Sequence, residues 1–228
     1  MLAENGASNI ILKSGTKTQP EEVLAMSSQN EQDKLYIEKY MPKNKKGYFI
    51  EIGGADGIKN SNTLYLEEGL KWDGLCVEAN PKLFKLLDQN RCCNKINAAC
   101  GAISGDQLEF VCMDQFSSFL DFAGKYRKRL LDHKKKHPED GLLIPIKTLT
   151  EILEQVNAPT IIDFFSLDVE GAELEVLTGL DFEKYKIDCI LVEHNSEQPK
   201  RANIRKFLQS KNYYKAENLL LDDLYKLR

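Results

Sequence analysis

The sequence lacks any run of apolar residues long enough to cross a bilayer, and its opening segment, MLAENGASNIILKSG, lacks the charged and apolar regions of a secretory signal. It also lacks an internal repeat and an excess of positive charge, because its formal net charge is -4. A negative net charge argues against general attraction to nucleic acid or to an anionic membrane. We therefore expect a cytoplasmic protein that binds no membrane and whose partner is not nucleic acid.

The six cysteines show no metal-binding pattern. Cys92 and Cys93 are adjacent rather than spaced as CxxC, and no histidine lies near them, which disfavours a zinc site or a disulfide framework. Cys76 and Cys189 lie in the apolar runs GLCVEA and IDCILVEH. We expect these two thiols to be reduced and buried in separate strands.

The length of 228 residues suits a single domain with a sizeable core. Residues 1–27 are rich in small polar side chains and show no periodicity, so we expect a flexible N-terminal lead-in there and a folded domain over residues 28–228. Residues 121–140 include a strongly basic stretch that is expected to form a helical insertion.

Apolar runs and helical segments alternate along the folded part. Strands are expected at 48–52, 74–79, 95–99, 161–168 and 190–194, with extended pieces at 107–112 and 142–147. Helices are expected at 31–40, from Ser61 or Asn62 to 68, and at 82–89, 149–156, 171–177 and 202–209. Residues 213–217 and 223–227 suggest a terminal antiparallel hairpin. This order predicts an α/β fold, a mostly parallel sheet with helices on both faces. Pro145 should place segment 142–147 at an edge or outside the main sheet.

Acidic residues occur at the carboxyl ends of four expected strands, where ligands bind in such sheets. Glu51 precedes the glycine-rich turn GGADG, and Glu78 ends the next strand, where an acid can accept both hydroxyls of a ribose. An acid at Glu51 would repel the pyrophosphate of a dinucleotide but would favour the positive charges of S-adenosylmethionine. The alternative is that both acids are solvated strand ends.

The segments YFIEIGGADGIKNSNT, GLCVEANP, KINAACG and FFSLDVEGAELEVLTGL resemble the FkbM family of class I, Rossmann-like methyltransferases, whose best-known members O-methylate sugars and polyketide-like products. The resemblance implies a seven-stranded sheet with an antiparallel hairpin, and S-adenosylmethionine as cofactor. It further implies that Glu78 holds the ribose and that Asp168 lies near the amino group and the reaction centre. The methionine side would be lined by Glu51, Gly53, Gly54, Ala55 and Asn62, and the adenine by Ala79, Asn80, Ala98 and Ala99. Ala55 departs from the second glycine found in many methyltransferases.

Methyl transfer to a hydroxyl requires alignment of the acceptor and a base for its proton. His194 is the first candidate base, because imidazole titrates near neutral pH and the residue is expected to face the cofactor cleft. Asp168 and Glu170 are the next candidates. A structural role for His194, and a helix-capping role for Glu170, are the alternatives.

Some related sugar methyltransferases use Mg²⁺, and the resemblance implies Asp168 and Glu193 as its candidate ligands here, with His194 in place of a third acid. We expect an S-adenosylmethionine-dependent O-methyltransferase acting on a sugar or glycan hydroxyl. The alternatives are another small hydroxylated acceptor, an NAD-binding oxidoreductase, and a non-catalytic interaction module. The basic insertion is expected to be a solvated helix face or to lie over the acceptor pocket and meet a phosphate-bearing sugar. Tyr126 is the only aromatic residue of the basic stretch 124–140, which is too few for a nucleic-acid stacking surface.

Overall fold

The computed structural model describes the chain except for residues 1–27, 30, 42–45, 106 and 115. The expected lead-in at 1–27, and most of the turn expected after the first helix, therefore lie outside the described residues. The core of the molecule is a seven-stranded sheet with the strand order β10-β11-β9-β8-β1-β2-β3. Its strands are β1 (Tyr48–Ile52), β2 (Asp73–Glu78), β3 (Asn94–Asn97), β8 (Ile161–Leu167), β9 (Lys186–Glu193), β10 (Tyr213–Asn218) and β11 (Asp222–Leu227).

Five neighbouring strands, from β3 to β9, run parallel, and β11 is antiparallel to both β9 and β10. The predicted fold class and the predicted terminal hairpin are confirmed. All five residues of β1 are buried, as expected for a strand in the middle of a parallel sheet that is covered on both faces.

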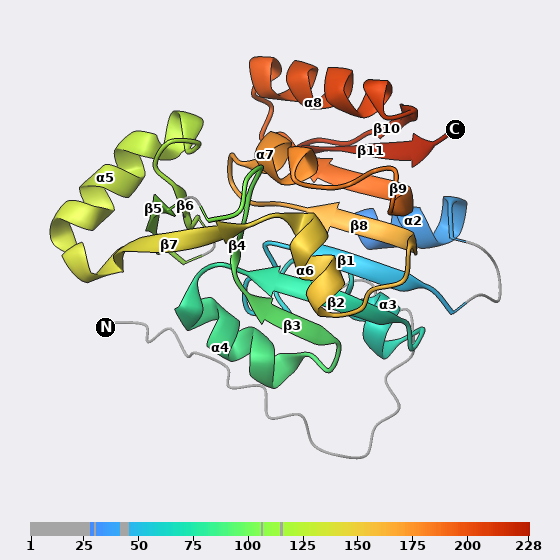
Figure 1. The fold of residues 1–228 in the computed structure, drawn as a ribbon, viewed down its shortest axis with the longest axis horizontal. Coiled ribbons are helices and arrows are strands. Elements are labelled where there is room, and N and C mark those ends of the chain that lie inside the picture. Colours follow the sequence, from blue (N-terminus) through green and yellow to red (C-terminus); the bar gives the residue numbers. More distant parts are fainter. Residues whose placement is uncertain (1–27, 30, 42–45, 106, 115) are drawn as a thin grey trace, which may run out of the picture.

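Helices cover both faces of this sheet (Figure 1). Alternate β1 side chains point to opposite faces, so Phe49 packs in one apolar cluster and Ile50 in the other. The Phe49 face is covered by α2 (Gln32–Lys39), α3 (Leu64–Glu68) and α4 (Pro81–Asn90), and the Ile50 face by α6 (Leu149–Gln155), α7 (Glu173–Thr178) and α8 (Gln198–Ser210). Cys76 and Cys189 are fully buried on the Phe49 face, as predicted.

A second, four-stranded sheet lies beside the first and has the order β4-β7-β5-β6. It consists of β4 (Ala99–Cys100), β5 (Gln107–Val111), β6 (Ser118–Phe119) and β7 (Gly141–Lys147). Between β6 and β7 the basic insertion forms η1 (Gly124–Tyr126), α5 (Arg127–Lys136) and η2 (Pro138–Asp140). Figure 1 shows this sheet and α5 together at one side of the main sheet. The strand expected at 95–99 therefore divides, because β3 ends at Asn97 and the chain then enters the second sheet. Pro145 lies outside the main sheet, as predicted.

Two helices begin later than expected, and each has a side chain at its start that explains the shift. The Ser61 hydroxyl accepts the N–H of Leu64 at 3.1 Å, so α3 begins at Leu64 rather than at Ser61 or Asn62. Before α7, the Glu173 carboxylate accepts the N–H groups of Val169 and Gly171 at 3.3 and 3.1 Å. The capping acid of this helix is thus Glu173, and not Glu170.

A buried arginine joins β1, α3 and the end of α4. The Arg91 guanidinium is 3.0 Å from the Glu51 carboxylate and 2.5 Å from that of Glu67, and its Nη2 donates to the Thr63 hydroxyl at 2.9 Å. The Arg91 side chain is 0% exposed, so each charge depends on its partners to offset the loss of water. This cluster fixes the segment that connects the glycine turn to α3.

We predict that Arg91→Met destabilises the protein by about 3–5 kcal/mol, because two buried carboxylates lose their counter-charge. Urea unfolding followed by circular dichroism measures the loss. Lys85→Met, at an exposed position of the same helix, is the matched control and should change the free energy of unfolding by less than about 0.5 kcal/mol. Equal effects of the two substitutions would contradict a stabilising role of the Arg91 cluster.

Candidate active site

A pocket lies at the carboxyl ends of β1, β2, β8 and β9. β1 sits between β2 and β8, where the connections diverge to the two sides of the sheet and leave a crevice. Most of the residues predicted for the cofactor line this pocket: Glu51, Gly53, Gly54, Ala55, Glu78, Ala79, Ala98, Ala99 and Asp168. Glu170 and Glu193 also line it, whereas Asn62, Asn80 and His194 do not belong to its lining.

The glycine turn after β1 is held against the ends of the neighbouring strands. The N–H groups of Gly53 and Gly54 donate to the Val77 carbonyl at 2.9 and 3.1 Å. Gly53 has a φ of 86°, and a Cβ there would lie 1.6 Å from the Asp168 carbonyl oxygen. Only glycine fits this position, and its bare backbone forms part of the pocket wall.

Glu78 connects the glycine turn to the start of α4. Its carboxylate accepts the N–H of Ala55 at 2.9 Å and the N–H of Asn80 at 2.7 Å. Burial raises the pKa of Glu78 to about 7, although these two backbone donors act in the opposite direction. Each carboxylate oxygen has a further lone pair, so Glu78 can still accept hydroxyl donors from a ligand in the pocket.

Glu51 lines the same pocket, but protein groups already surround its carboxylate. It accepts hydrogen bonds from the Ser61 and Thr63 hydroxyls and from the Asn62 N–H, besides its ion pair with Arg91. The charge of Glu51 is therefore offset within the protein. This partner could not be predicted from the sequence, because Arg91 lies forty residues after Glu51, behind a helix, and belongs to no recognisable motif.

The acids at the ends of β8 and β9 converge. One carboxylate oxygen from each of Asp168, Glu170 and Glu193 lies within 4.8 Å of the others. The Asn195 amide donates to Glu193 at 2.5 Å and to Glu170 at 3.2 Å, which holds two of the acids in place. Glu170 reaches the cluster from a backbone with a φ of 54°. Glu170 is thus the third acid of this group, and not a residue apart from it.

This crowding changes the proton affinity of all three acids, which we call the acid cluster. The Asp168 side chain is exposed toward the pocket, and desolvation by the surrounding protein raises its pKa to about 6. Burial and the neighbouring charge of Asp168 raise the pKa of Glu170 to about 7. The same causes, in the same order, raise the pKa of Glu193 furthest. The cluster therefore holds protons near neutral pH.

His194 does not face the pocket, and that part of the prediction is wrong. β9 ends at Glu193, and the chain turns at Asn195, whose φ is 50°; Glu193 and Asn195 line the pocket, whereas His194 does not. The imidazole is 2% exposed, its Nδ1 accepts the Ser196 N–H at 3.0 Å, and its Nε2 lies 3.9 Å from the Asp223 carboxylate. Burial lowers the pKa of His194, so the ring is neutral and packed.

Asn62 and Asn80 support the site from outside the lining. The Asn62 amide donates to the Ser166 hydroxyl at 3.0 Å. Asn80 caps α4 by accepting the Lys82 N–H at 2.9 Å, and its amide donates to Ser117 at 3.0 Å. The Asn80 side chain is committed to the protein, whereas the buried Asn62 Oδ1 has no hydrogen-bond partner among the described residues.

Many lining residues had been given no role in the sequence analysis of the site, among them Lys59, Phe116, Tyr126 and Asn195. Lys59 directly follows the glycine turn, so its position offered a signal. Phe116 and Tyr126 come from the second sheet and the insertion, and nothing in their spacing places them at the ends of the main strands.

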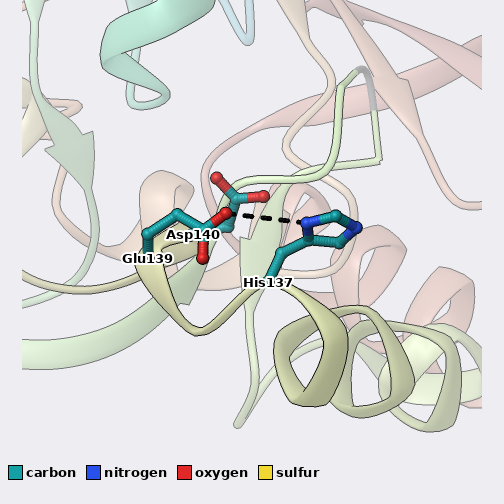
Figure 2. A group of neighbouring side chains, drawn as sticks. All are labelled: His137, Glu139 and Asp140. Carbon is teal, nitrogen blue, oxygen red and sulfur yellow. Dashed lines mark ion pairs between the residues drawn. The ribbon is translucent and has the colours of Figure 1, made fainter.

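A second group of possible metal ligands, His137, Glu139 and Asp140, lies at the end of α5 (Figure 2). One Asp140 oxygen is 2.6 Å from the Lys82 ammonium, and the other is 2.7 Å from Nε2 of His133. These partners lower the pKa of Asp140. Both oxygens are thus in use, and the group ties the insertion to α4.

The sequence matches the methyltransferase FkbM domain over residues 51–214. The chain belongs to the FkbM methyltransferase family. Membership makes it an S-adenosylmethionine-dependent methyltransferase, and the pocket lies where the predicted cofactor residues gather. The family match does not support the NAD-binding alternative.

A solved structure of this family shows the same fold, and two other solved methyltransferases are more distantly similar. The methyltransferase FkbM from Methylobacillus flagellatus is 14% identical, with a TM-score of 0.56 over 91% of this chain and 50% of its own, so this methyltransferase spans about half the length of that protein. The precorrin-6y C5,15-methyltransferase from Geobacter metallireducens is 11% identical, with a TM-score of 0.44 over 86% of this chain and 87% of its own. An S-adenosylmethionine-dependent methyltransferase from Aquifex aeolicus is 9% identical, with a TM-score of 0.40 over 92% of this chain and 98% of its own. A comparison with curated protein sequences gave no match.

None of the helices in the described part of the chain combines the length and the apolar character that a bilayer crossing requires.

The raised pKa of Glu170 predicts that this residue destabilises the folded state increasingly as pH rises. The folded state holds this proton up to about pH 7, whereas the unfolded chain releases it near 4.5, so the contribution of Glu170 to stability falls as pH rises between these values. Glu170→Gln should therefore gain stability relative to the wild type as pH rises from about 5 to 7. Urea unfolding across this range measures the difference. For the control Glu68→Gln, at an exposed site, the free energy of unfolding should change with pH as it does in the wild type. The same pH dependence in Glu170→Gln would refute the prediction.

Proposed function

We propose that this methyltransferase transfers the methyl group of S-adenosylmethionine to a hydroxyl of a sugar or glycan. The observation that carries the proposal is the acid cluster in the same pocket that Glu78 lines. A hydroxylated acceptor needs oxygen acceptors around it and a group that takes its proton, and the cluster offers both.

The donor would lie along the carboxyl ends of the strands. Glu78 would accept the ribose hydroxyls, and Ala79, Ala98 and Ala99 would leave room for the adenine. The ammonium and sulfonium would lie toward Asp168, where a positive charge offsets the crowded carboxylates. Lys59 also lines the pocket, and its ammonium would pair with the carboxylate of the donor.

Transfer breaks the sulfur–methyl bond, whose electron pair stays on sulfur, and forms an oxygen–methyl bond, while the hydroxyl proton passes to a carboxylate. Asp168 and Glu170 are the proposed proton acceptors in place of His194, which does not line the pocket. Their pKa values of about 6 and about 7 suit a base that works near neutral pH.

The acid cluster also fits Mg²⁺, because this ion prefers carboxylate oxygens and the three acids lie close together. Asp168, Glu170 and Glu193 would hold it. When bound, the ion would acidify the acceptor hydroxyl. The Asn195 amide supports the same two glutamates that would serve as ligands.

Isothermal titration with S-adenosylmethionine tests the cofactor assignment. We expect Glu78→Ala to weaken binding by about tenfold to a hundredfold, since the loss removes hydrogen bonds to a charged acceptor and loosens the turn at Ala55. Glu68→Ala, at an exposed site on α3, is the control and should bind like the wild type. A folded wild type that gives no heat with S-adenosylmethionine would overturn the proposal.

Thermal unfolding with MgCl₂ tests the metal assignment. Mg²⁺ should stabilise the wild type by about 1.4 kcal/mol at ten times its Kd. The effect should be larger at pH 8 than at pH 5.5, because the acids must lose their protons to bind the ion. Asp168→Asn should lose most of this stabilisation, and Glu68→Gln should keep it. Equal stabilisation of Asp168→Asn would show that the ion binds elsewhere.

A further inference from the structure

Some cations of the insertion form ion pairs and others do not. At the end of α5, Lys134 pairs with Glu109 and Lys135 with Asp132. Four cations precede them on η1 and the first turn of α5: Lys125, Arg127, Lys128 and Arg129. No ion pair within the described part of the chain involves any of these four. The segment that carries the unpaired cations, residues 125–129, also reaches the pocket, because its Tyr126 lines the wall.

Two aromatic rings meet these cations at the pocket wall. Phe116 and Tyr126 both line the pocket, with ring centroids 6.0 Å apart. The Arg129 guanidinium lies 4.3 Å from the centre of the Phe116 ring, and the Lys125 ammonium lies 4.9 Å from that of Tyr126. We call Phe116, Lys125, Tyr126 and Arg129 the rim platform.

The rim platform is connected to the acid cluster. The Lys125 ammonium donates to the Asn195 carbonyl at 2.8 Å, and the Asn195 amide donates to Glu170 and Glu193. Cations thus lie against one part of the pocket wall, over Phe116 and Tyr126, and the acid cluster forms another part of it. Asp114 also lines the wall, where its carboxylate can accept a ring hydroxyl.

This polarity selects the orientation of an acceptor. A molecule with a hydroxyl at one end and an anionic group at the other is favoured with the hydroxyl toward the acid cluster, because the reverse orientation places its charge against these acids. The faces of Phe116 and Tyr126 offer an apolar surface to the C–H face of a sugar ring. Arg129 offers a planar pair of donors for a carboxylate or a phosphate.

We propose that the rim platform binds the acceptor as an anionic saccharide, with its ring on Phe116 and Tyr126 and its carboxylate or phosphate on Arg129 and Lys125. The inference rests on the proposed function, since it names the acceptor class for the same pocket.

Titration calorimetry in the presence of S-adenosylhomocysteine tests this assignment with three probes: methyl β-glucuronide, glucose 1-phosphate and methyl β-glucoside. At least one anionic probe should bind about tenfold or more tightly than the neutral glucoside, and added salt should reduce the difference. The two anionic probes distinguish a carboxylate from a phosphate.

Arg129→Met should abolish this preference while leaving the affinity for the glucoside unchanged. Phe116→Leu, which keeps an apolar side chain but removes the ring, should weaken all probes that bind. Lys136→Met, an exposed cation at the far end of α5, is the control and should match the wild type. Affinity for S-adenosylhomocysteine, measured first for every variant, reports on folding and on the cofactor site.

The titrations distinguish a failure of the proposed function from a failure of the anionic-saccharide proposal. If the wild type binds no S-adenosylhomocysteine, the proposed function fails. If it binds S-adenosylhomocysteine but binds no anionic probe, or binds the glucoside equally well, the anionic-saccharide proposal is overturned and the proposed function stands.

Discussion

Crowding of carboxylates at one edge of a parallel sheet is the constraint on which the site depends. Parallel strands end at the same edge, so Glu51, Glu78, Asp168 and Glu193 are brought together by topology alone. Burial there disfavours every negative charge, and each acid needs a partner or a proton. Within the described part of the chain, a direct ion pair joins just one of these four acids to a cation, the pair of Glu51 with Arg91.

The remaining acids define what the pocket can accept. Glu78 is held by backbone donors, and the acid cluster retains protons near neutral pH. A phosphate-bearing nucleotide would add charge of the same sign, whereas a sulfonium donor adds the opposite sign. The fold, the family and the electrostatics therefore agree on the cofactor, and the cations at the pocket wall extend the same argument to the acceptor.

The sequence predicted the main sheet well because its central strands are buried on both faces and therefore appear as short apolar runs, such as those at β1 and β8. It did not predict the second sheet, whose strands β4 and β6 have two residues each and carry no periodicity. The lining residues at strand ends were predictable, because strand ends can be located from the runs. Arg91 was not, since its partners lie far away in sequence. The orientation of His194 was not predictable, because it lies just past the end of β9, where the alternation of a strand no longer fixes the direction of a side chain.

The most direct measurement follows the carboxyl carbons of Asp168, Glu170 and Glu193 by NMR titration, in the free protein and with each cofactor form. The account predicts apparent midpoints well above those of solvated acids in the free protein. Saturation with S-adenosylmethionine should lower them, and S-adenosylhomocysteine should lower them less, because its sulfur is neutral. Midpoints near 4 in the free protein, or equal effects of the two cofactor forms, would contradict the claim that crowded acids receive a positively charged donor.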